Sequence, residues 1–329
     1  MTLNPTRRAA LAAPLLLGAA ACSQEIGERP LRGADTHAAG YPTVQAVDHF
    51  GELLSERTDG RLRLRNYPGG QLGGEGDTLE ITMFGGLDLN RVNLAPLNVI
   101  EPTTFVPALP FLFSSIDHMR RSLDGAPGRV ILESLRPHGL IGLCFYDSGQ
   151  RSFYNRLRPV RTPQDLAGMK IRVQPSDLYV AMVRALGANP TPIPFGEVYQ
   201  ALVQGVVDGA ENNMPSYDDT RHHEVAPYYT ATGHVMAPEV FVMSQRTWDR
   251  LTPADRDLVM ECADESVPYM RDLWDAREAS SRENVIAAGC ELIEDVDVEP
   301  FRALMAPVWE QFITTDLQQR LVRDIQAME

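Results

Sequence analysis

The spacing of hydrophobic positions along the chain alternates between the two-residue repeat of strands and the three-to-four-residue repeat of helices. Residues 31–36 are predicted to form a strand. Residues 41–58 are predicted to form a helix, whose apolar face consists of Val44, Val47, Phe50, Leu53 and Leu54. Residues 61–65 and 87–94 alternate as half-buried strands do, and a glycine-rich turn and a helix lie between them. This repeated order predicts a mainly parallel sheet covered by helices.

A second unit of the same kind is predicted from about residue 149. A strand is predicted at residues 140–146, just before this unit. Within it, a new element is predicted at 150–155, strands at 170–173 and 206–209, and a helix at 197–204. Thr162 and Thr252 each precede a proline and stand three positions before an acidic residue, which is typical of a helix N-terminus. The second of these signals opens a helical stretch that is predicted to reach about Ala288, with a kink at Pro268.

Two α/β units without a flexible linker between them imply that the chain crosses from one to the other more than once. Ligands of open α/β sheets bind outside the carboxyl ends of the strands, and between two units that place is a cleft. The predicted fold class is therefore α/β and two-lobed, with a ligand cleft between the lobes and a long connecting helix.

Composition restricts the classes of ligand that this chain can bind. The 329 residues carry a formal net charge of −14, which argues against nucleic acid because phosphate binding needs a basic surface. The overall field also repels small anions, so an anionic ligand needs cationic side chains placed at its own site.

The N-terminus predicts export from the cytoplasm. Arg7 and Arg8 precede an apolar run from Ala9 to Ala21, which is too short to span a bilayer but suits a signal peptide. Residues 1–22 are therefore predicted to be a signal peptide. The small residues before Cys22 resemble a bacterial lipoprotein cleavage site, with a lipid anchor on that cysteine. A plain cleavage site with an incidental cysteine is the alternative, and the paired arginines also resemble a twin-arginine signal.

Signatures of catalysis and of metal binding are mostly absent from the sequence. It has no H-E-x-x-H, G-x-S-x-G or phosphate-binding G-x-x-x-x-G-K-[ST] motif. The pair His222-His223 has poor spacing for metal ligands, so neither a metal nor a cofactor is expected. The remaining cysteines, Cys144, Cys262 and Cys290, are expected to be small buried hydrophobes. One disulfide between Cys262 and Cys290 is conceivable but unsupported.

The candidate chemistry consists of arginines at strand ends. Arg172 lies in an otherwise apolar strand just before Gln174, and a buried guanidinium needs a partner. That partner is either a carboxylate of the protein itself or a ligand carboxylate held by a bidentate pair. Arg151, at the start of another element, is a candidate second cation.

Several segments together resemble the TRAP transporter solute-binding proteins of the DctP family. The signature-like stretches are GANPTPIPFGEVYQAL and GVVDGAENN within residues 170–213. Further matches are YPGGQLGGE at 67–75, LPFLF at 109–113, YDSGQRSFYN at 146–155, TPQDLAGMKIRV and the WDRLTPADRDL stretch from Trp248. The resemblance extends over about residues 31–312, and the combination of motifs is highly specific.

The resemblance implies roles for individual residues. Arg172 of K-I-R-V corresponds to the family's main anchor for the ligand carboxylate, Arg151 to a second contact, and Asn212 of D-G-x-E-N to a hydrogen-bond partner of that carboxylate. Phe195 corresponds to a residue that packs against the ligand, and Glu75 to one that reaches its polar part. Asn213 of the same segment as Asn212 is a further candidate.

Two segments resemble a subgroup that binds sugar acids. These are ENNMPSY at 211–217 and TRHHEVAPYY at 220–229, although Met214 stands where similar sequences often have tryptophan. Candidates for contacts to ligand hydroxyls, each equally compatible with a purely structural role, are His37, Arg91, Asn93, Tyr217 and Glu239.

The sequence thus predicts a periplasmic receptor for a small organic acid, with separate TRAP membrane permease subunits as partners and no catalysis of its own. Hexuronates are the leading ligands, ahead of other sugar acids and C4-dicarboxylates. A sensor subunit and, less favoured, an enzyme acting on sugar acids are the rival hypotheses. Residues 28–149 with about 236–277 are expected to form lobe I, and residues 150–235 with about 278–329 lobe II.

Overall fold

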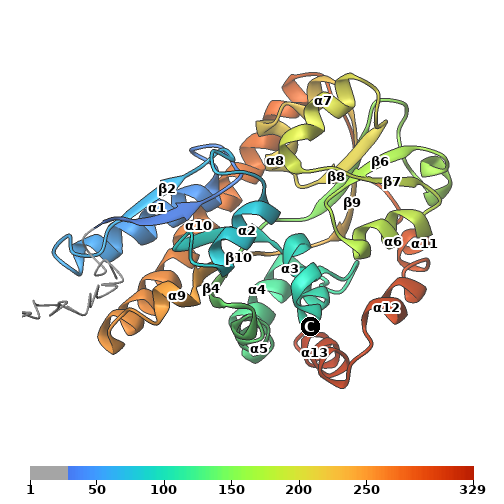
Figure 1. Ribbon diagram of the computed structural model, residues 1–329. Coiled ribbons are helices and arrows are strands. Elements are labelled where there is room, and N and C mark those ends of the chain that lie inside the picture. The colour runs from blue at the N-terminus through green and yellow to red at the C-terminus, as the bar shows by residue number, and fades with distance from the viewer. Residues whose placement is uncertain (1–28) are drawn as a thin grey trace, which may run out of the picture.

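The computed structural model describes residues 29–329, which form two α/β lobes joined along a long helix (Figure 1). The predicted signal peptide and the predicted acylation site at Cys22 lie outside the described residues. No helix within residues 29–329 combines the length and the apolar character that a membrane crossing requires.

The first lobe is built on a five-stranded sheet with the order β2-β1-β3-β10-β4. Its strands are β1 (Leu31–Ala34), β2 (Leu64–Tyr67), β3 (Leu89–Asn93), β4 (Leu140–Tyr146) and β10 (Glu239–Ser244). Its helical segments are α1 (Pro42–Glu56), α2 (Glu75–Met83), α3 (Leu94–Ile100), η1 (Pro102–Ala108), α4 (Ile116–Asp124), α5 (Ala126–Glu133), η2 (Arg136–His138) and α9 (Gln245–Trp248).

The second lobe is built on a six-stranded sheet with the order β11-β9-β5-β8-β6-β7. Its strands are β5 (Arg151–Asn155), β6 (Lys170–Val173), β7 (Asn189–Pro192), β8 (Gly209–Asn212), β9 (Tyr228–Val235) and β11 (Glu291–Ile293). The helical segments around it are η3 (Pro163–Leu166), α6 (Asp177–Ala185), η4 (Phe195–Glu197), α7 (Val198–Val203), α8 (Met214–Asp219), η5 (His222–Glu224), α11 (Glu299–Arg302) and α12 (Ala306–Phe312).

Both sheets are mixed, whereas the sequence pattern predicted a mainly parallel arrangement. β1 is parallel to β2 and β3, and β6 is parallel to β7 and β8. The antiparallel pairs all involve strands β5 and β10, each of which directly follows a strand-to-strand crossing between the lobes. A strand that enters a lobe by such a crossing runs antiparallel to its neighbours in the sheet. The alternation of strands and helices along the sequence contains no information about this direction.

Helix α1 illustrates how the local sequence determines an element. Pro42 occupies the first turn, where its missing N–H is not needed. The apolar positions Val44, Val47, Phe50 and Leu54 recur at helical spacing, and all four are at most 1% exposed. The prediction of a helix at 41–58 is therefore confirmed apart from its ends.

Two strands begin about three residues later than their patterns indicated. The strand predicted at 61–65 is β2 at Leu64–Tyr67, because its register is set by pairing with β1, which begins at Leu31. The strand predicted at 206–209 is β8, which starts at Gly209 where its neighbours β5 and β6 first reach it. A Cβ at Gly209 would lie 2.4 Å from the backbone oxygen of Tyr154, so only glycine fits this close strand approach.

Helix α10 (Pro253–Ala287) connects the two lobes along 35 residues. Thr252 caps it by accepting a hydrogen bond from the backbone N–H of Asp255 at 3.1 Å, as the sequence predicted. It packs against α1 and β4 of the first lobe and against α8 of the second, and Figure 1 shows it passing from α9 toward α8. Pro268 lies inside the helix, which continues through it.

The C-terminal helix α13 (Asp316–Gln326) packs on the first lobe, against η1 and α5. His118 Nε2 lies 2.8 Å from the backbone oxygen of Ile325, and Gln318 Nε2 donates to the backbone oxygen of Pro102 at 2.8 Å. The predicted assignment of all of residues 278–329 to the second lobe did not anticipate this return of the chain.

Candidate functional site

Polar residues of both lobes converge on a small cavity between the two sheets. It is lined by Thr36, His37, Glu75, Asn93, Ser148, Arg151, Gln174, Phe195, Asn212, Asn213, Ser216 and Glu239. Most of these residues stand at strand ends: Thr36 follows β1, Asn93 ends β3 and Asn212 ends β8. Glu239 and Arg151 begin β10 and β5, whose antiparallel direction brings their first residues to the same edge.

The cavity continues into a wider groove at the mouth of the cleft. Thr36, Glu75, Gln174 and Phe195 line both spaces. The additional walls of the groove are α2 and α3 of the first lobe and, on the second lobe, the segments that follow β6 and β7. Arg172 lines this groove but not the inner cavity.

Arg172 is 1% exposed and has no acidic partner among the described residues. Its Nε donates to the backbone oxygen of Ile193 at 2.8 Å, while its buried Nη1 has no hydrogen-bond partner within residues 29–329. Burial lowers the pKa of the guanidinium to about 10, because neighbouring negative groups such as Glu211 offset only part of the desolvation. The residue remains a cation at neutral pH, so its charge is buried without an internal counter-ion.

Arg151, in contrast, forms an ion pair with Glu211, and both side chains are at most 1% exposed. Arg151 Nε donates to Glu211 Oε2 at 2.6 Å and Nη2 to Glu211 Oε1 at 2.8 Å, while Nη1 donates to Asn212 Oδ1 at 2.9 Å. Burial would raise the pKa of Glu211, but the charge and hydrogen bonds of Arg151 lower it to about 2. Arg151 therefore adds no net positive charge to the cavity.

Arg91 lies beneath the cavity and is surrounded by three carboxylates. It contacts Asp35 through Nε at 2.9 Å and also through Nη2. Its Nη1 lies 2.7 Å from Glu75 Oε1 and 3.0 Å from Glu239 Oε2, and its Nη2 also donates to Thr36 Oγ1 at 3.0 Å. The side chain is 0% exposed and does not line the cavity, although the sequence had made it a candidate for contacts to hydroxyls.

The first-lobe side of the cavity is acidic. Glu75 accepts from the backbone N–H of Asn93 at 3.2 Å, and Thr36 Oγ1 donates to it at 3.3 Å. Glu239 contacts His37 Nε2 and Ser148 Oγ, both at 3.3 Å. Burial would raise the pKa of Glu239, but the charge of Arg91 and the hydrogen bonds of His37 and Ser148 lower it to about 2, so this carboxylate is ionised.

Amides and aromatic rings complete the site. Asn213 caps α8 by accepting from the backbone N–H of Ser216 at 2.8 Å, and its Nδ2 donates to Ser148 Oγ at 3.1 Å. The ring of Phe195 meets His37 edge-on at 5.1 Å, and His37 stacks on Tyr41 at 3.9 Å. The second lobe thus presents cationic and amide donors, and the first lobe presents acceptors.

Tyr217 does not line the cavity. It is fully buried, its hydroxyl donates to the backbone oxygen of Ala226 at 2.7 Å, and its ring packs against Tyr154 and Tyr229. His222 belongs to the same buried region: its Nδ1 lies 2.7 Å from the hydroxyl of Tyr154, and burial lowers its pKa to about 3. These side chains therefore belong to the packed interior of the second lobe.

Sequence reasoning missed four residues that line the cavity: Thr36, Ser148, Gln174 and Ser216. The first three stand one or two positions after a strand that ends at the cleft, and this position is the signal that could have identified them. Ser216 lies in the first turn of α8, and no such signal marks it in the sequence. Gln174 lines both the cavity and the groove, and its buried Oε1 has no hydrogen-bond partner within residues 29–329. It is therefore a further candidate for a contact to the ligand.

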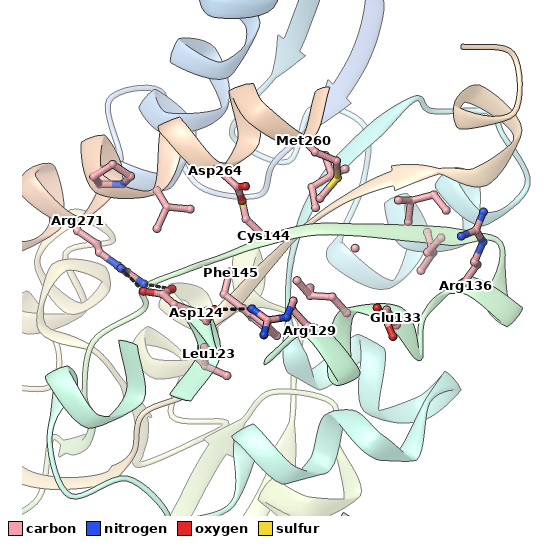
Figure 2. Close-up of a pocket in the computed structure, with 17 residues that line it drawn as sticks. Leu123, Asp124, Arg129, Glu133, Arg136, Cys144, Phe145, Met260, Asp264 and Arg271 are labelled. Carbon is pink, nitrogen blue, oxygen red and sulfur yellow. Dashed lines mark hydrogen bonds and ion pairs between the residues drawn. The ribbon is translucent and has the colours of Figure 1, made fainter. Parts of the chain in front are cut away.

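A separate pocket on the first lobe lies beside the edge strand β4, between α5 and α10 (Figure 2). Arg271 pairs with Asp124 at 2.8 Å at one end of it, and Cys144 forms part of its wall. All of its lining comes from the first lobe and α10, and it contains none of the candidate residues, so it is distinct from the cleft.

Within residues 29–329, neither a cysteine nor a metal-binding cluster lines the cavity or the groove. Cys144, Cys262 and Cys290 are free thiols, so the disulfide considered between Cys262 and Cys290 does not form, and the first two are buried as expected. Residues 29–329 contain no group of three or more His, Cys, Asp or Glu side chains placed to hold a metal ion.

Two α/β lobes with a polar cleft between them, crossed repeatedly by the chain, define a binding protein of the periplasmic type. Residues 33–316 match the DctP family, described as bacterial extracellular solute-binding protein, family 7, and the chain belongs to this family. A solute-binding protein of Chromohalobacter salexigens is 39% identical over 296 residues, which are 90% of this chain and 88% of that protein.

Solved structures of similar proteins have the same fold. A TRAP periplasmic solute binding protein from a Bradyrhizobium species, in complex with α/β-D-galacturonate, is 48% identical with a TM-score of 0.89, covering 91% of this chain and 100% of its own. A counterpart from Roseobacter denitrificans with bound β-D-glucuronate is 44% identical with a TM-score of 0.89, covering 92% of this chain and 100% of its own.

Proposed function

We propose that this protein is the extracytoplasmic receptor of a TRAP importer and that it captures a hexuronate such as D-galacturonate or D-glucuronate. The observation that carries the proposal is the guanidinium of Arg172, which is buried at the cleft without an acidic partner within residues 29–329. An unpaired buried charge costs several kcal/mol, and a ligand carboxylate in the cleft removes most of that cost. The similar proteins that bind galacturonate and glucuronate support this ligand class.

In this proposal the carboxylate of the hexuronate binds Arg172, and Asn212 and the remaining N–H of Arg151 donate to it from the same lobe. Each charge-assisted hydrogen bond contributes about 1.5–3 kcal/mol. The ring hydroxyls donate to Glu75 and Glu239 across the cavity, Asn93, His37 and Gln174 supply further polar contacts, and Phe195 packs on the apolar face of the sugar ring. Two or three such bonds with apolar packing suffice for micromolar affinity.

Closure of the two lobes over the ligand follows from the placement of its contacts. A ligand that is held by Arg172 on one lobe and by Glu75 on the other stabilises the closed form, because neither set of contacts is complete in an open cleft. In this proposal the closed receptor delivers its ligand to the TRAP membrane subunits, which are separate chains. Cleavage and acylation at Cys22 would keep it at the membrane surface.

The test is a calorimetric titration of the purified protein with D-galacturonate and D-glucuronate, combined with a thermal-shift screen over other organic acids. We expect micromolar or tighter binding, with an increase in stability of about 2.7 kcal/mol when the free ligand is at 100 times its Kd. Chromatography of the released ligand should recover it chemically unchanged, which distinguishes a receptor from an enzyme. The absence of binding heat and of a melting shift with both hexuronates would contradict the proposal.

A further inference from the structure

The charges around the cleft are distributed unequally between the two lobes. On the second lobe, Glu211 neutralises Arg151, and among the described residues that line the cleft this leaves Arg172 as a cation without a carboxylate partner. On the first lobe, Arg91 faces Asp35, Glu75 and Glu239 together. Three carboxylates around one guanidinium leave an excess of two negative charges.

Arg91 is directed at the carboxylates and the hydroxyl of the first lobe and is not available to a ligand. A guanidinium carries five N–H groups. The N–H group at Nε donates to Asp35, and the N–H groups at Nη2 donate to Asp35 and Thr36. Nη1 donates to Glu75 Oε1 at 2.7 Å and lies 3.0 Å from Glu239 Oε2, which has no hydrogen-bond partner among the described residues. Since the side chain is also 0% exposed, it holds these two carboxylates in place and cannot receive an anion from the cavity.

Glu75 and Glu239 therefore present acceptors to the cavity. Arg91, Thr36 and the N–H of Asn93 all bind Oε1 of Glu75, and no described residue donates to its Oε2. Hydroxyl groups can donate to such oxygens, whereas a carboxylate at neutral pH has no proton to donate. Like charges brought together at a binding site cost several kcal/mol.

We infer that the cleft discriminates between monoacids and diacids of the same sugar, because Glu75 and Glu239 form an anionic wall on the lobe opposite Arg172. This inference rests on the proposed function. A uronate has one carboxylate, which Arg172 binds, and hydroxyls at its other end. An aldarate has carboxylates at both ends, so one of them must face the wall. The anionic wall thus rejects aldarates and, by the same reasoning, C4-dicarboxylates.

The experiment compares the affinities of three six-carbon acids by calorimetry. D-galacturonate is titrated directly, and galactarate and D-galactonate are measured by displacement of bound D-galacturonate. Galactonate is an open-chain monoacid, so it separates the effect of the second charge from the effect of losing the sugar ring. We expect the wild type to bind galactarate about 100-fold more weakly than galacturonate, and at least about tenfold more weakly than galactonate.

Glu75→Gln removes one charge and keeps an amide oxygen for Arg91, while its NH₂ group becomes a donor that can face a second carboxylate. We expect galactarate to bind at least about tenfold more tightly to this variant and galacturonate to bind more weakly. Glu239→Gln should likewise increase the affinity for galactarate and decrease the affinity for galacturonate. Glu197→Gln is the matched control, since Glu197 is an exposed carboxylate that lines the groove but not the inner cavity. It should leave the ratio of the affinities unchanged.

The outcomes separate this inference from the proposed function. If the wild type fails to bind galacturonate, the proposed function is wrong whatever the diacid does. If it binds galacturonate but binds galactarate as tightly as galactonate, the wall does not select and the inference alone is overturned. A uniform loss of affinity for all three acids in both Gln variants would likewise reduce Glu75 and Glu239 to structural residues.

Discussion

The two buried arginines of the second lobe have opposite electrostatic surroundings, although Arg151 begins β5 and Arg172 lies one residue before the end of β6. Arg151 is held by the carboxylate of Glu211 through N–H···O contacts of 2.6 and 2.8 Å and by its backbone oxygen at 2.9 Å. Arg172 has only a backbone carbonyl as its hydrogen-bond partner among the described residues. The first arrangement stabilises the lobe, while the second stores an unfavourable charge that a bound anion relieves. Mutation should therefore affect folding in one case and binding in the other.

Arg151→Met should destabilise the protein by about 3–5 kcal/mol, because it leaves Glu211 buried without its counter-ion. The measurement is the free energy of unfolding from urea denaturation. The double variant Arg151→Met with Glu211→Met is the control, since it removes both charges and should recover most of the loss. An unchanged urea midpoint in the single variant would show that Arg151 does not hold this part of the fold.

At the scale of elements, the short crossing between β4 and β5 determines how the lobes meet. Gly149 lies in this crossing with a φ of +59°, and a Cβ there would lie 2.9 Å from Cζ2 of Trp274. Trp274 is 1% exposed on α10, and its ring meets Tyr41 edge-on at 5.8 Å. The crossing is thus packed directly on the helix that connects the lobes, and only glycine provides both the backbone angle and the space.

Gly149→Ala should therefore lower the free energy of unfolding by about 1–2 kcal/mol for the backbone angle and by about 1–3 kcal/mol for the contact with Trp274. Gly168→Ala is the matched control, because Gly168 has a φ of +77° and nothing within 4 Å of its Cβ position. It should lose only the backbone contribution and keep its affinity for hexuronate. Equal losses in the two variants, measured by thermal unfolding, would argue against tight packing at the crossing.

At the scale of the whole molecule, the lobes are joined by residues 147–150, residues 236–238 and α10, and α13 returns to the first lobe near the C-terminus. The apolar core is correspondingly shared: one cluster of buried residues includes Val92 and Leu140 of the first lobe and Ile171 and Phe301 of the second. The lobe closure proposed above would be a rotation of two packed bodies about these short connections, with the cleft on the moving boundary.

Local pattern predicted the elements of this molecule better than its pairings. Helix α1 and strand β4 follow from hydrophobic spacing, and the cap at Thr252 marks the start of α10. The mixed sheets, the later start of β8 and the return of α13 depend on contacts between residues distant in sequence, which periodicity does not record.

The candidate site was also predictable only where local sequence identifies its residues, and not where contacts between distant residues determine their charge. The family motifs and strand ends led to residues that line one cavity, such as Glu75, Asn212 and Glu239. They did not reveal that Glu211 neutralises Arg151, because that pair depends on the register of β5 against β8. Nor did they show that three carboxylates enclose Arg91.

The most direct test of this account is the calorimetric affinity of Arg172→Met for D-galacturonate, measured beside wild type and beside Arg184→Met, which changes an exposed arginine on α6. We predict that Arg172→Met binds at least about 100-fold more weakly, from the loss of two charge-assisted hydrogen bonds, while Arg184→Met binds as wild type does. The ligand-free Arg172→Met protein should be no less stable than wild type, because the substitution removes an unpaired buried charge. Wild-type affinity in Arg172→Met would contradict the account.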